Sequence, residues 1–396
     1  IPLARLGMPD YDNMKQSTDP EDYTLDNIGM AHVKFEFPKE VRYPGFPVRT
    51  SEILLGESNK VYDLGLVFPR TGTTYACSPE IFLARQLGAK LTIINGVILP
   101  FKSSGVRPFF QVVKGTTGLR LEYGEKGDEL MEEMYKEITN SLYGKTAQGI
   151  RESSGFSPKT EQNEKLPPSR ITNPYIAAYV TSYVRATLTE IMNRLPKDQS
   201  IISVTTDGFP TDATKEDVEN IMTSGPIAQD FGITRKATSG TFEILKIKHE
   251  VRQFFATGTR RQATILRGED VEKKDTFLAR GGHTKMRKGK NLNEDEEKLI
   301  PYSESLLLVE KMVNRKGLMA DESSPLTTMR DMHLKGLDMV DIKRYKWISA
   351  EYDWKCRPDL ETAHMAKICV NEEAIEVNSK GEHRHKSIDI NMEHVS

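Results

Sequence analysis

Apolar residues predict strands through most of the first 125 positions. AHVKFEF (residues 31–37) alternates apolar and polar positions, whereas VYDLGLVF (61–68) and KLTIINGVILP (90–100) are apolar runs bounded by Gly and Pro. One helix is expected between these runs, over SPEIFLARQLGA (78–89). In it, Ser78 is a suitable N-cap and Gly88 a stop.

The middle of the chain predicts two long helices. The first covers about 128–148, and the second runs from the N-cap Asn173 to Pro196. The polar segment between them, 151–170, contains Pro and Ser and is expected to be a mobile surface loop. Tyrosines recur every fourth residue in the second helix, which favours core packing over a stacking platform for bases: Tyr175, Tyr179 and Tyr183.

A β-hairpin is predicted after the second helix. In IISVTTDGFPTD (201–212) an apolar run is followed by Asp-Gly and an aromatic residue, which puts Asp207 at the tip. Further strands are expected in TFEILKIKHE (241–250), RQATILRG (261–268) and DTFLARGG (275–282). The pattern then turns helical, most clearly over 296–313, and the residues after about 372 are polar.

Composition narrows the class of protein without deciding its function. The 396 residues are 37% hydrophobic and 28% charged, as in a globular chain of two or three domains. No apolar run approaches the length of a membrane span, and no signal peptide is evident, so a cytoplasmic location without membrane contact is expected. Three scattered cysteines favour neither a disulfide framework nor a zinc site. The net charge of −2 does not by itself indicate a nucleic-acid partner.

The first long helix has two distinct sides. Leu130, Met134, Ile138 and Leu142 share a broad apolar face. Lys136, Asn140 and Tyr143 cluster on the opposite side and offer a cation, an amide and an aromatic ring, which suit a triphosphate, a base pair and a stacked base. Gly144 then permits close approach of another group. An ordinary amphipathic helix would explain the same periodicity.

The exact sequence of this helix is more informative about function than its periodicity. KEITNSLYGKTAQG matches K-x-x-x-N-S-x-Y-G, the motif of family B DNA polymerases on the helix that lines the incoming-nucleotide pocket. NPYIAAYVTSYVRATLTEIMNRL leading to SVTTDGF resembles the palm helix and metal-binding hairpin of that family, and YACSPEIFLARQLGAKLTIINGV is similar to an earlier palm segment. The resemblance covers roughly residues 30–285. It is closest to the protein-primed polymerases of phages, viruses and linear plasmids and to their primer-independent relatives.

The resemblance implies an α+β fold. We expect a right-hand palm, built as an antiparallel sheet with packed helices, together with a helical fingers insertion and a small thumb. The expected divisions are the N-terminal part of the palm (1–125), the fingers helix and its surface loop (126–172), the palm with the hairpin (173–290), a thumb-like helical region (291–372) and a polar tail (373–396).

The resemblance also implies roles for individual residues. Lys136 would contact the phosphates of a dNTP, Asn140 and Tyr143 would line the nascent base pair, and Gly144 would allow close packing there. Asp207 would be the catalytic, metal-ligating carboxylate. Contacts to template–primer DNA are expected from ATGTRRQATI and HTKMRKGK, although the usual Lys-x-Tyr of the family is not spelled in the first of these segments. The expected DNA-binding residues are Arg260, Arg261, Lys285 and Arg287.

Nucleotidyl transfer in this family uses two Mg²⁺ ions, for which Mn²⁺ can substitute, and two Asp residues normally hold them. The usual hairpin reads Asp-Thr-Asp, but here it reads Thr205-Thr206-Asp207, a departure at the position that variants of the family also alter. The second carboxylate belongs to an upstream D-x-x-S-L-Y-P-S motif, which we expect just before Ile1 in a longer parent. Asp63 in DLGLVFP is a weaker match that lacks the Ser. The exonuclease motifs of the family are not present in this sequence.

The main interpretation is thus a DNA-directed DNA polymerase that serves the replication of a phage, a virus or a mobile element. An alternative is a catalytically incomplete remnant or subunit that binds nucleic acid. A third interpretation is an RNA polymerase or a reverse transcriptase. It is disfavoured because the corresponding hairpin and helix of those enzymes have different sequences. Whether a terminal priming protein is required or dispensed with depends on the branch of the family.

Overall fold

The computed structural model describes part of the chain. Backbone structure is described for residues 1–50, 53–54, 61–62, 65–222, 224–247, 255–258, 261–263, 277–280, 283–286, 318–323, 327–336, 344–349, 375–377 and 383–385.

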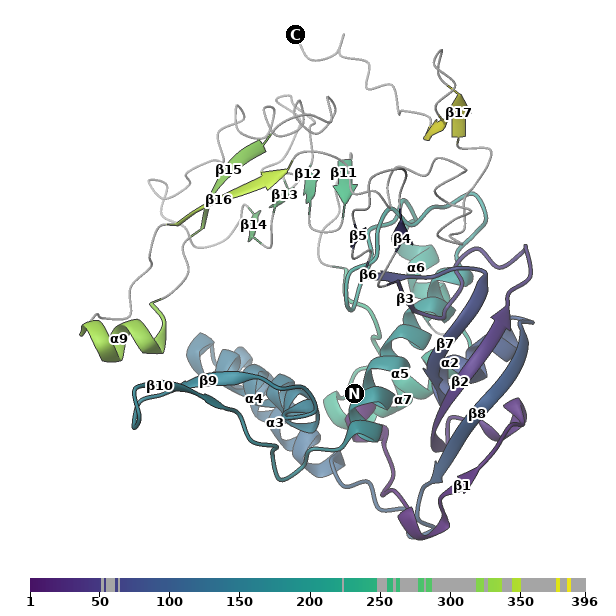
Figure 1. Cartoon of the computed structure of the whole chain (residues 1–396), viewed down its shortest axis with the longest axis horizontal. Coiled ribbons are helices and arrows are strands. Elements are labelled where there is room, and N and C mark those ends of the chain that lie inside the picture. The colour runs from purple at the N-terminus through teal and green to yellow at the C-terminus, as the bar shows by residue number, and fades with distance from the viewer. Residues whose placement is uncertain are drawn as a thin grey trace.

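Helices and strands both occur throughout these residues (Figure 1). The helical elements are α1 (Pro2–Arg5), η1 (Tyr11–Asn13), η2 (Pro20–Asp22), α2 (Ser78–Gln86), α3 (Phe110–Glu125), α4 (Glu129–Ala147), α5 (Pro174–Asn193), α6 (Lys215–Met222), α7 (Pro226–Ser239) and α9 (Met329–Lys335). The strands before α5 are β1 (Lys15–Gln16), β2 (Asn27–Glu36), β3 (Val48–Thr50), β4 (Ile53–Leu54), β5 (Val61–Tyr62), β6 (Gly65–Val67), β7 (Thr71–Cys77), β8 (Lys90–Pro100), β9 (Ser154–Ser157) and β10 (Gln162–Lys165). The later strands are β11 (Phe255–Gly258), β12 (Arg261–Ala263), β13 (Phe277–Arg280), β14 (His283–Met286), β15 (Leu318–Ser323), β16 (Arg344–Ser349), β17 (Ile375–Val377) and β18 (His383–His385).

An antiparallel sheet in the order β1-β8-β2-β7 forms the N-terminal part of the molecule. Its inner face buries Val33 and Phe35 of β2, and Ile93 of β8, against Ile81 of α2. Figure 1 shows α2 and α5 against this sheet, and both helices contact β2 and β7. The expected α+β class, an antiparallel sheet with packed helices, is confirmed, and so are the strands predicted over 31–37 and 90–100.

The start of α2 lies one residue earlier than predicted. Cys77, not Ser78, is the N-cap residue, and Glu80 closes the first turn by accepting a hydrogen bond from the Cys77 N–H at 3.3 Å. The Ser78 hydroxyl instead bonds elements outside the helix: it donates to Asn27 Oδ1 at 2.6 Å and accepts from the Gly29 N–H at 2.7 Å. Ser78 therefore joins α2 to β2.

The long helix α5 lies at the centre of the main core. Tyr179 and Tyr183 are fully buried, and Tyr175 packs against the same cluster, so the prediction of core tyrosines is confirmed. The predicted N-cap is also confirmed, since the Asn173 side chain accepts from the N–H groups of Tyr175 at 3.1 Å and Ile176 at 3.2 Å.

The helix α3 was not predicted. It carries three glycines and β-branched pairs, which disfavour a helix in isolation, but it packs lengthwise on α4. The two form a helical hairpin that projects from the sheet domain (Figure 1). This helical hairpin begins at Phe110, before the expected division at 125/126.

Two further expectations between α4 and residue 247 are wrong. The segment 151–170 is not simply a loop, because β9 and β10 pair within it, from Ser154 with Lys165 to Ser157 with Gln162. The strand expected from Thr241 is not formed over 241–247, where the backbone is irregular. The helices α6 and α7 were also missed.

Later in the chain, β11, β12, β13 and β14 form a four-stranded antiparallel sheet, which confirms strands within 261–268 and 275–282. The region 291–372 is not purely helical, since β15 and β16 pair on either side of α9. The helix expected over 296–313 lies outside the described residues. Within the polar tail, β17 pairs with β18.

Candidate nucleotidyl-transfer site

The helix α4 begins at the N-cap Asp128, whose side chain accepts from the Met131 N–H at 3.1 Å. It packs on α3 mainly through polar and aromatic side chains: Thr139 donates to Thr116 at 2.9 Å, and Tyr135 stacks on Tyr123 with ring centroids 5.6 Å apart. The apolar face predicted from periodicity is therefore not the face that packs on α3. Only Leu142 of that face joins the core, whereas Leu130, Met134 and Ile138 are exposed.

The motif residues lie on neighbouring parts of α4. Lys136 is half-exposed, and its ammonium group pairs with Glu133 one turn earlier at 2.8 Å. Asn140 is exposed, and Tyr143 is partly buried against the cluster that contains Tyr179. Gly144 is exposed, and a methyl group added at its Cα would have no described neighbour within 4 Å. Of the motif, Asn140 is thus exposed, Lys136 is half-exposed and the Tyr143 ring packs in part on the core.

Asp207 lies at the exposed tip of the predicted hairpin. Thr205 and Gly208 exchange backbone hydrogen bonds of 2.9 and 2.8 Å, so the turn centres on Thr206 and Asp207, not on the Asp-Gly pair. Thr206 has a φ of 28°, in the left-handed region that non-glycine residues rarely adopt. The hairpin consists of isolated bridges rather than regular strands, and its tip presents the carboxylate to solvent.

The base of this hairpin is fixed to the end of α5. Ile201 and Phe209 pack against the cluster that includes Ile191 of α5. Asp212 accepts from the Ser200 N–H at 2.6 Å, which closes the base from the other side. The Asp212 side chain is therefore used within the hairpin.

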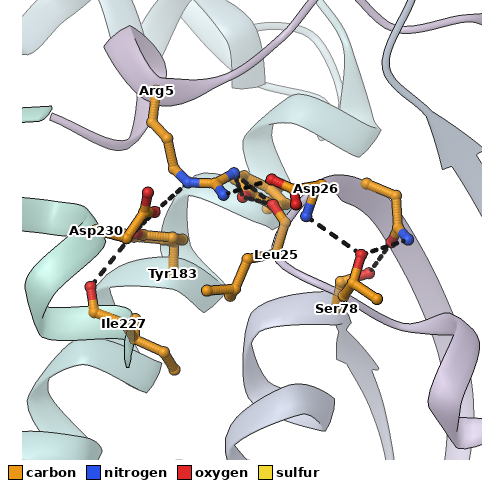
Figure 2. A network of polar contacts seen from close by, with 10 residues as sticks. Arg5, Leu25, Asp26, Ser78, Tyr183, Ile227 and Asp230 are labelled. Carbon is orange, nitrogen blue, oxygen red and sulfur yellow. Dashed lines mark hydrogen bonds and ion pairs between the residues drawn. The ribbon is translucent and has the colours of Figure 1, made fainter. Parts of the chain in front are cut away.

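A buried polar network holds α5 to the start of the chain (Figure 2). The Arg5 guanidinium donates to Asp230 of α7, to the Leu25 carbonyl, to the Tyr179 hydroxyl at 2.8 Å and to Asp26 at 3.1 Å. The same Asp230 carboxylate accepts from the Tyr183 hydroxyl. One side chain thereby connects α1, the segment before β2, α5 and α7.

The described residues do not complete a metal site. Among them, no three His, Cys, Asp or Glu side chains lie close enough together to hold an ion. Asp207 is a hard oxygen donor of the kind that Mg²⁺ prefers, but within the described residues it belongs to no group of three such ligands. Asp63, the weaker candidate for that partner, lies outside the described residues.

The expected DNA-contacting residues fall in or beside the sheet β11-β12-β13-β14. Arg261 begins β12 and Lys285 lies in β14, so the two belong to one sheet with β13 between their strands. Arg260 and Arg287 lie outside the described residues.

Comparison with known proteins shows which family contains α4 and the hairpin. Residues 6–226 match the family of DNA polymerase type B, organellar and viral. The chain belongs to this family. The match contains α4 with its complete motif, α5 and the hairpin.

Two kinds of relative are similar to this family B chain. It is 35% identical over 377 residues to the primer-independent DNA polymerase PolB of Escherichia coli, and the match covers 92% of the chain but 40% of that protein. Solved structures of Phi29 DNA polymerase are also similar. The ternary complex with primer-template DNA and incoming nucleotide has 14% identity and a TM-score of 0.34, with 52% of this chain and 36% of that chain covered. The orthorhombic crystal form has 15% identity and a TM-score of 0.33, with the same coverage.

Within the part of the family B chain that the structure describes, no helix combines the length and the apolar character needed to cross a membrane.

Proposed function

We propose that this chain supplies the nucleotide-binding helix and one catalytic carboxylate of a DNA-directed DNA polymerase, which adds dNTPs to a 3′-hydroxyl on a DNA template. The observation that carries the proposal is the full K-x-x-x-N-S-x-Y-G spelling on an exposed side of α4, within the family match. The chain spans 40% of the length of its PolB relative, so the activity belongs to the whole protein of which this chain would be a part.

The helix α4 has the side chains to bind a triphosphate and a base pair. Among the described residues, Lys136 pairs with Glu133 of the same helix, an exposed contact that contributes little free energy and that nucleotide phosphates can replace. Asn140 and Tyr143 lie beside it, one exposed and the other anchored in the core. A fixed ring next to a free amide would position a base while the cation holds the phosphates.

Asp207 would provide one carboxylate for divalent metal binding. Bound Mg²⁺ supplies the activation of the 3′-hydroxyl and the neutralisation of the leaving pyrophosphate in this class of reaction. The hairpin would hold the carboxylate at a fixed place on α5, and Thr205 and Thr206 would leave it without a neighbouring acidic group in the turn. The second carboxylate would come from the D-x-x-S-L-Y-P-S motif expected upstream of Ile1.

Primer extension by the whole parent protein tests this assignment. With Mg²⁺ and dNTPs, Asp207→Asn should lower the rate by at least about a thousandfold, the size of loss seen when a central catalytic group is removed. Asp212→Asn is the matched control, since it changes a carboxylate in the same hairpin whose bond goes to the backbone. Retention of activity in Asp207→Asn would contradict the proposal.

A second pair of variants tests the nucleotide contact. Lys136→Ala should raise KM for dNTP, because phosphate binding loses its cation, whereas Lys145→Ala on the same helix should change it little. Parallel reactions with primed and unprimed template, and with dNTP or rNTP, would show the priming mode and the sugar preference. DNA binding without any incorporation by the parent would favour the alternative of a catalytically incomplete remnant.

A further inference from the structure

The outer face of the sheet β1-β8-β2-β7 carries side chains that the core does not use. Val33 and Phe35 of β2 point into the core, so the alternating residues His32, Lys34 and Glu36 point to the other face. Over residues 32–36 this face lies opposite the side that packs on Ile81 and Ala84 of α2. Toward the start of β2 the same alternation brings Ile28 into the core beside Tyr179 of α5, so the exposed part of the face lies toward the end of β2. Its residues belong neither to α4 nor to the Asp207 hairpin.

An aromatic pair dominates this face. Tyr75 of β7 is directly opposite His32 in the antiparallel register, and their rings stack with centroids 4.6 Å apart and planes 15° apart. The Tyr75 side chain is nonetheless 73% exposed, more than any other aromatic residue that the structure describes. His32 covers one side of the ring and holds it flat, which leaves ring surface open to solvent.

The surroundings of the pair are mainly polar, apart from exposed Ile94 at the β8 bulge, and they include an uncompensated positive charge among the described residues. Glu36 is paired with Lys90 of β8 at 3.7 Å, whereas exposed Lys34, between that pair and His32, makes no ion pair with the described residues. The cross-strand neighbours carry hydroxyl and amide groups: Thr73, Thr92 and Asn95. A protein-binding surface would instead concentrate large apolar side chains and avoid lysine at its centre.

We propose that this outer face binds single-stranded nucleic acid, with a base stacked on Tyr75 and a backbone phosphate at Lys34. An exposed flat ring beside a lysine offers the two interactions that single strands use most, stacking and phosphate pairing. Because a duplex keeps its bases stacked on one another, its base faces are not available to a sheet surface. The hydroxyl and amide side chains at the adjoining register positions can bond sugar or base edges without selecting one sequence.

Binding of a fluorescent oligodeoxythymidylate to the full chain tests the proposal, with unlabelled blunt duplex in excess to occupy other DNA-binding surfaces. Tyr75→Ala should weaken binding of the labelled strand about tenfold, as expected for the loss of one stacked base. Tyr75→Phe keeps the ring and should bind within about twofold of the original chain. Tyr75 is so exposed that truncation is expected to leave the fold intact, which circular dichroism would verify.

Lys34→Ala should lower the affinity and reduce the slope of log K against log salt concentration by about 0.7, the value for one phosphate contact in a single strand. Lys39→Ala, an exposed lysine just beyond the end of β2, is the matched control and should leave both unchanged. Photocrosslinking with iodouracil in the oligonucleotide should label the peptide that contains Tyr75. An oligouridylate of equal length distinguishes DNA from RNA as the bound strand, and binding of either supports the proposal.

Unchanged affinity in both Tyr75→Ala and Lys34→Ala would overturn the proposal. So would equal competition by the duplex, or crosslinks confined to other peptides. None of these outcomes depends on catalysis, so a failure here leaves the polymerase assignment of Asp207 untouched, and failure of that assignment leaves this one untouched.

Discussion

At the scale of single residues, Arg5 is the side chain on which the most contacts depend. Its side chain is 7% exposed, and its hydrogen-bond partners come from three other segments of the chain. The Tyr183 ring also lies beneath the guanidinium, 5.6 Å from the ring centroid to the central carbon. A buried charge with this many partners is costly to leave unpaired, so removing one member should cost more than the pair contributes.

We therefore expect Arg5→Ala to lower the free energy of unfolding by about 3–5 kcal/mol, because Asp230 and the Tyr179 hydroxyl lose the guanidinium that they bond. Urea unfolding followed by circular dichroism would measure this. Lys15→Ala, which breaks an exposed pair with Asp22, should cost less than about 1 kcal/mol. The double change Arg5→Met and Asp230→Leu should recover much of the loss, and a loss as large as that of Arg5→Ala alone would contradict the role of charge.

Glu190 gives a prediction of pH dependence. Burial raises the pKa of this carboxyl, opposed in part by the Ala228 N–H, which donates to it at 2.7 Å, and by Arg194. Because the pKa is higher in the folded state, that state binds the proton more tightly. Glu190 then costs nothing below its unfolded-state pKa, and the cost grows as pH rises through the folded-state value.

The free energy of unfolding of the original chain, minus that of Glu190→Gln, should therefore fall as pH rises from about 4 to about 8. Urea titrations of both proteins across this range would measure the difference, in which other titrating groups cancel. A difference that stays flat or rises with pH would contradict a raised pKa for this carboxyl in the folded state.

At the scale of elements, α2, α4 and α5 were predicted close to their observed positions because start and stop signals flank each of these helices. The helix α3 was not predicted because its glycines and β-branched residues have low helix propensity, and packing on α4 stabilises it. The exposure of Leu130, Met134 and Ile138 has the same origin: α4 meets α3 through Tyr135 and Thr139, so the periodic apolar stripe was not the packed one.

The cap of α5 gives a prediction at this scale. Asn173 accepts from two N–H groups of the first turn and has no replacement nearby if its side chain is removed. Asn173→Ala should lower the free energy of unfolding by about 1 kcal/mol, whereas Asn173→Asp, which keeps an accepting oxygen, should cost much less. Urea unfolding of both variants would check the ranking, and equal losses would assign the effect to something other than the cap.

At the scale of the whole molecule, the α+β class and the family could be predicted from the sequence. The contacts that the candidate site residues make could not. The motif on α4 predicted a nucleotide helix from spelling alone, and in the structure its residues range from exposed to partly buried. The sequence could not show that Lys136 is paired with Glu133, that the Asp207 turn centres one residue earlier, or that Tyr75 and His32 stack across strands. These depend on contacts between side chains and strands that no local pattern encodes.

The whole chain has a net charge of −2, yet 246–261 and 283–290 are locally basic, and this contrast makes a prediction. If DNA contacts those segments, its affinity should fall linearly on logarithmic axes as salt rises, because each phosphate contact releases counterions. Anisotropy titrations at several salt concentrations would give the slope. Neutralising Arg260 and Arg261 together should make the slope shallower by about 1.8 for duplex DNA. A slope near zero in the original chain would argue against phosphate contacts.

The Arg5 network has a consequence for how related sequences diverge. Arg5 and Asp230 are separated by 225 positions, and they meet in an interior where neither charge is easily left alone. A substitution at one position should therefore be accepted mainly when the other changes too, so the pair should covary among relatives. The Tyr183 hydroxyl donates to the same Asp230 carboxylate. Tyr183 should therefore be replaced by an apolar aromatic residue only in relatives that have lost this carboxylate.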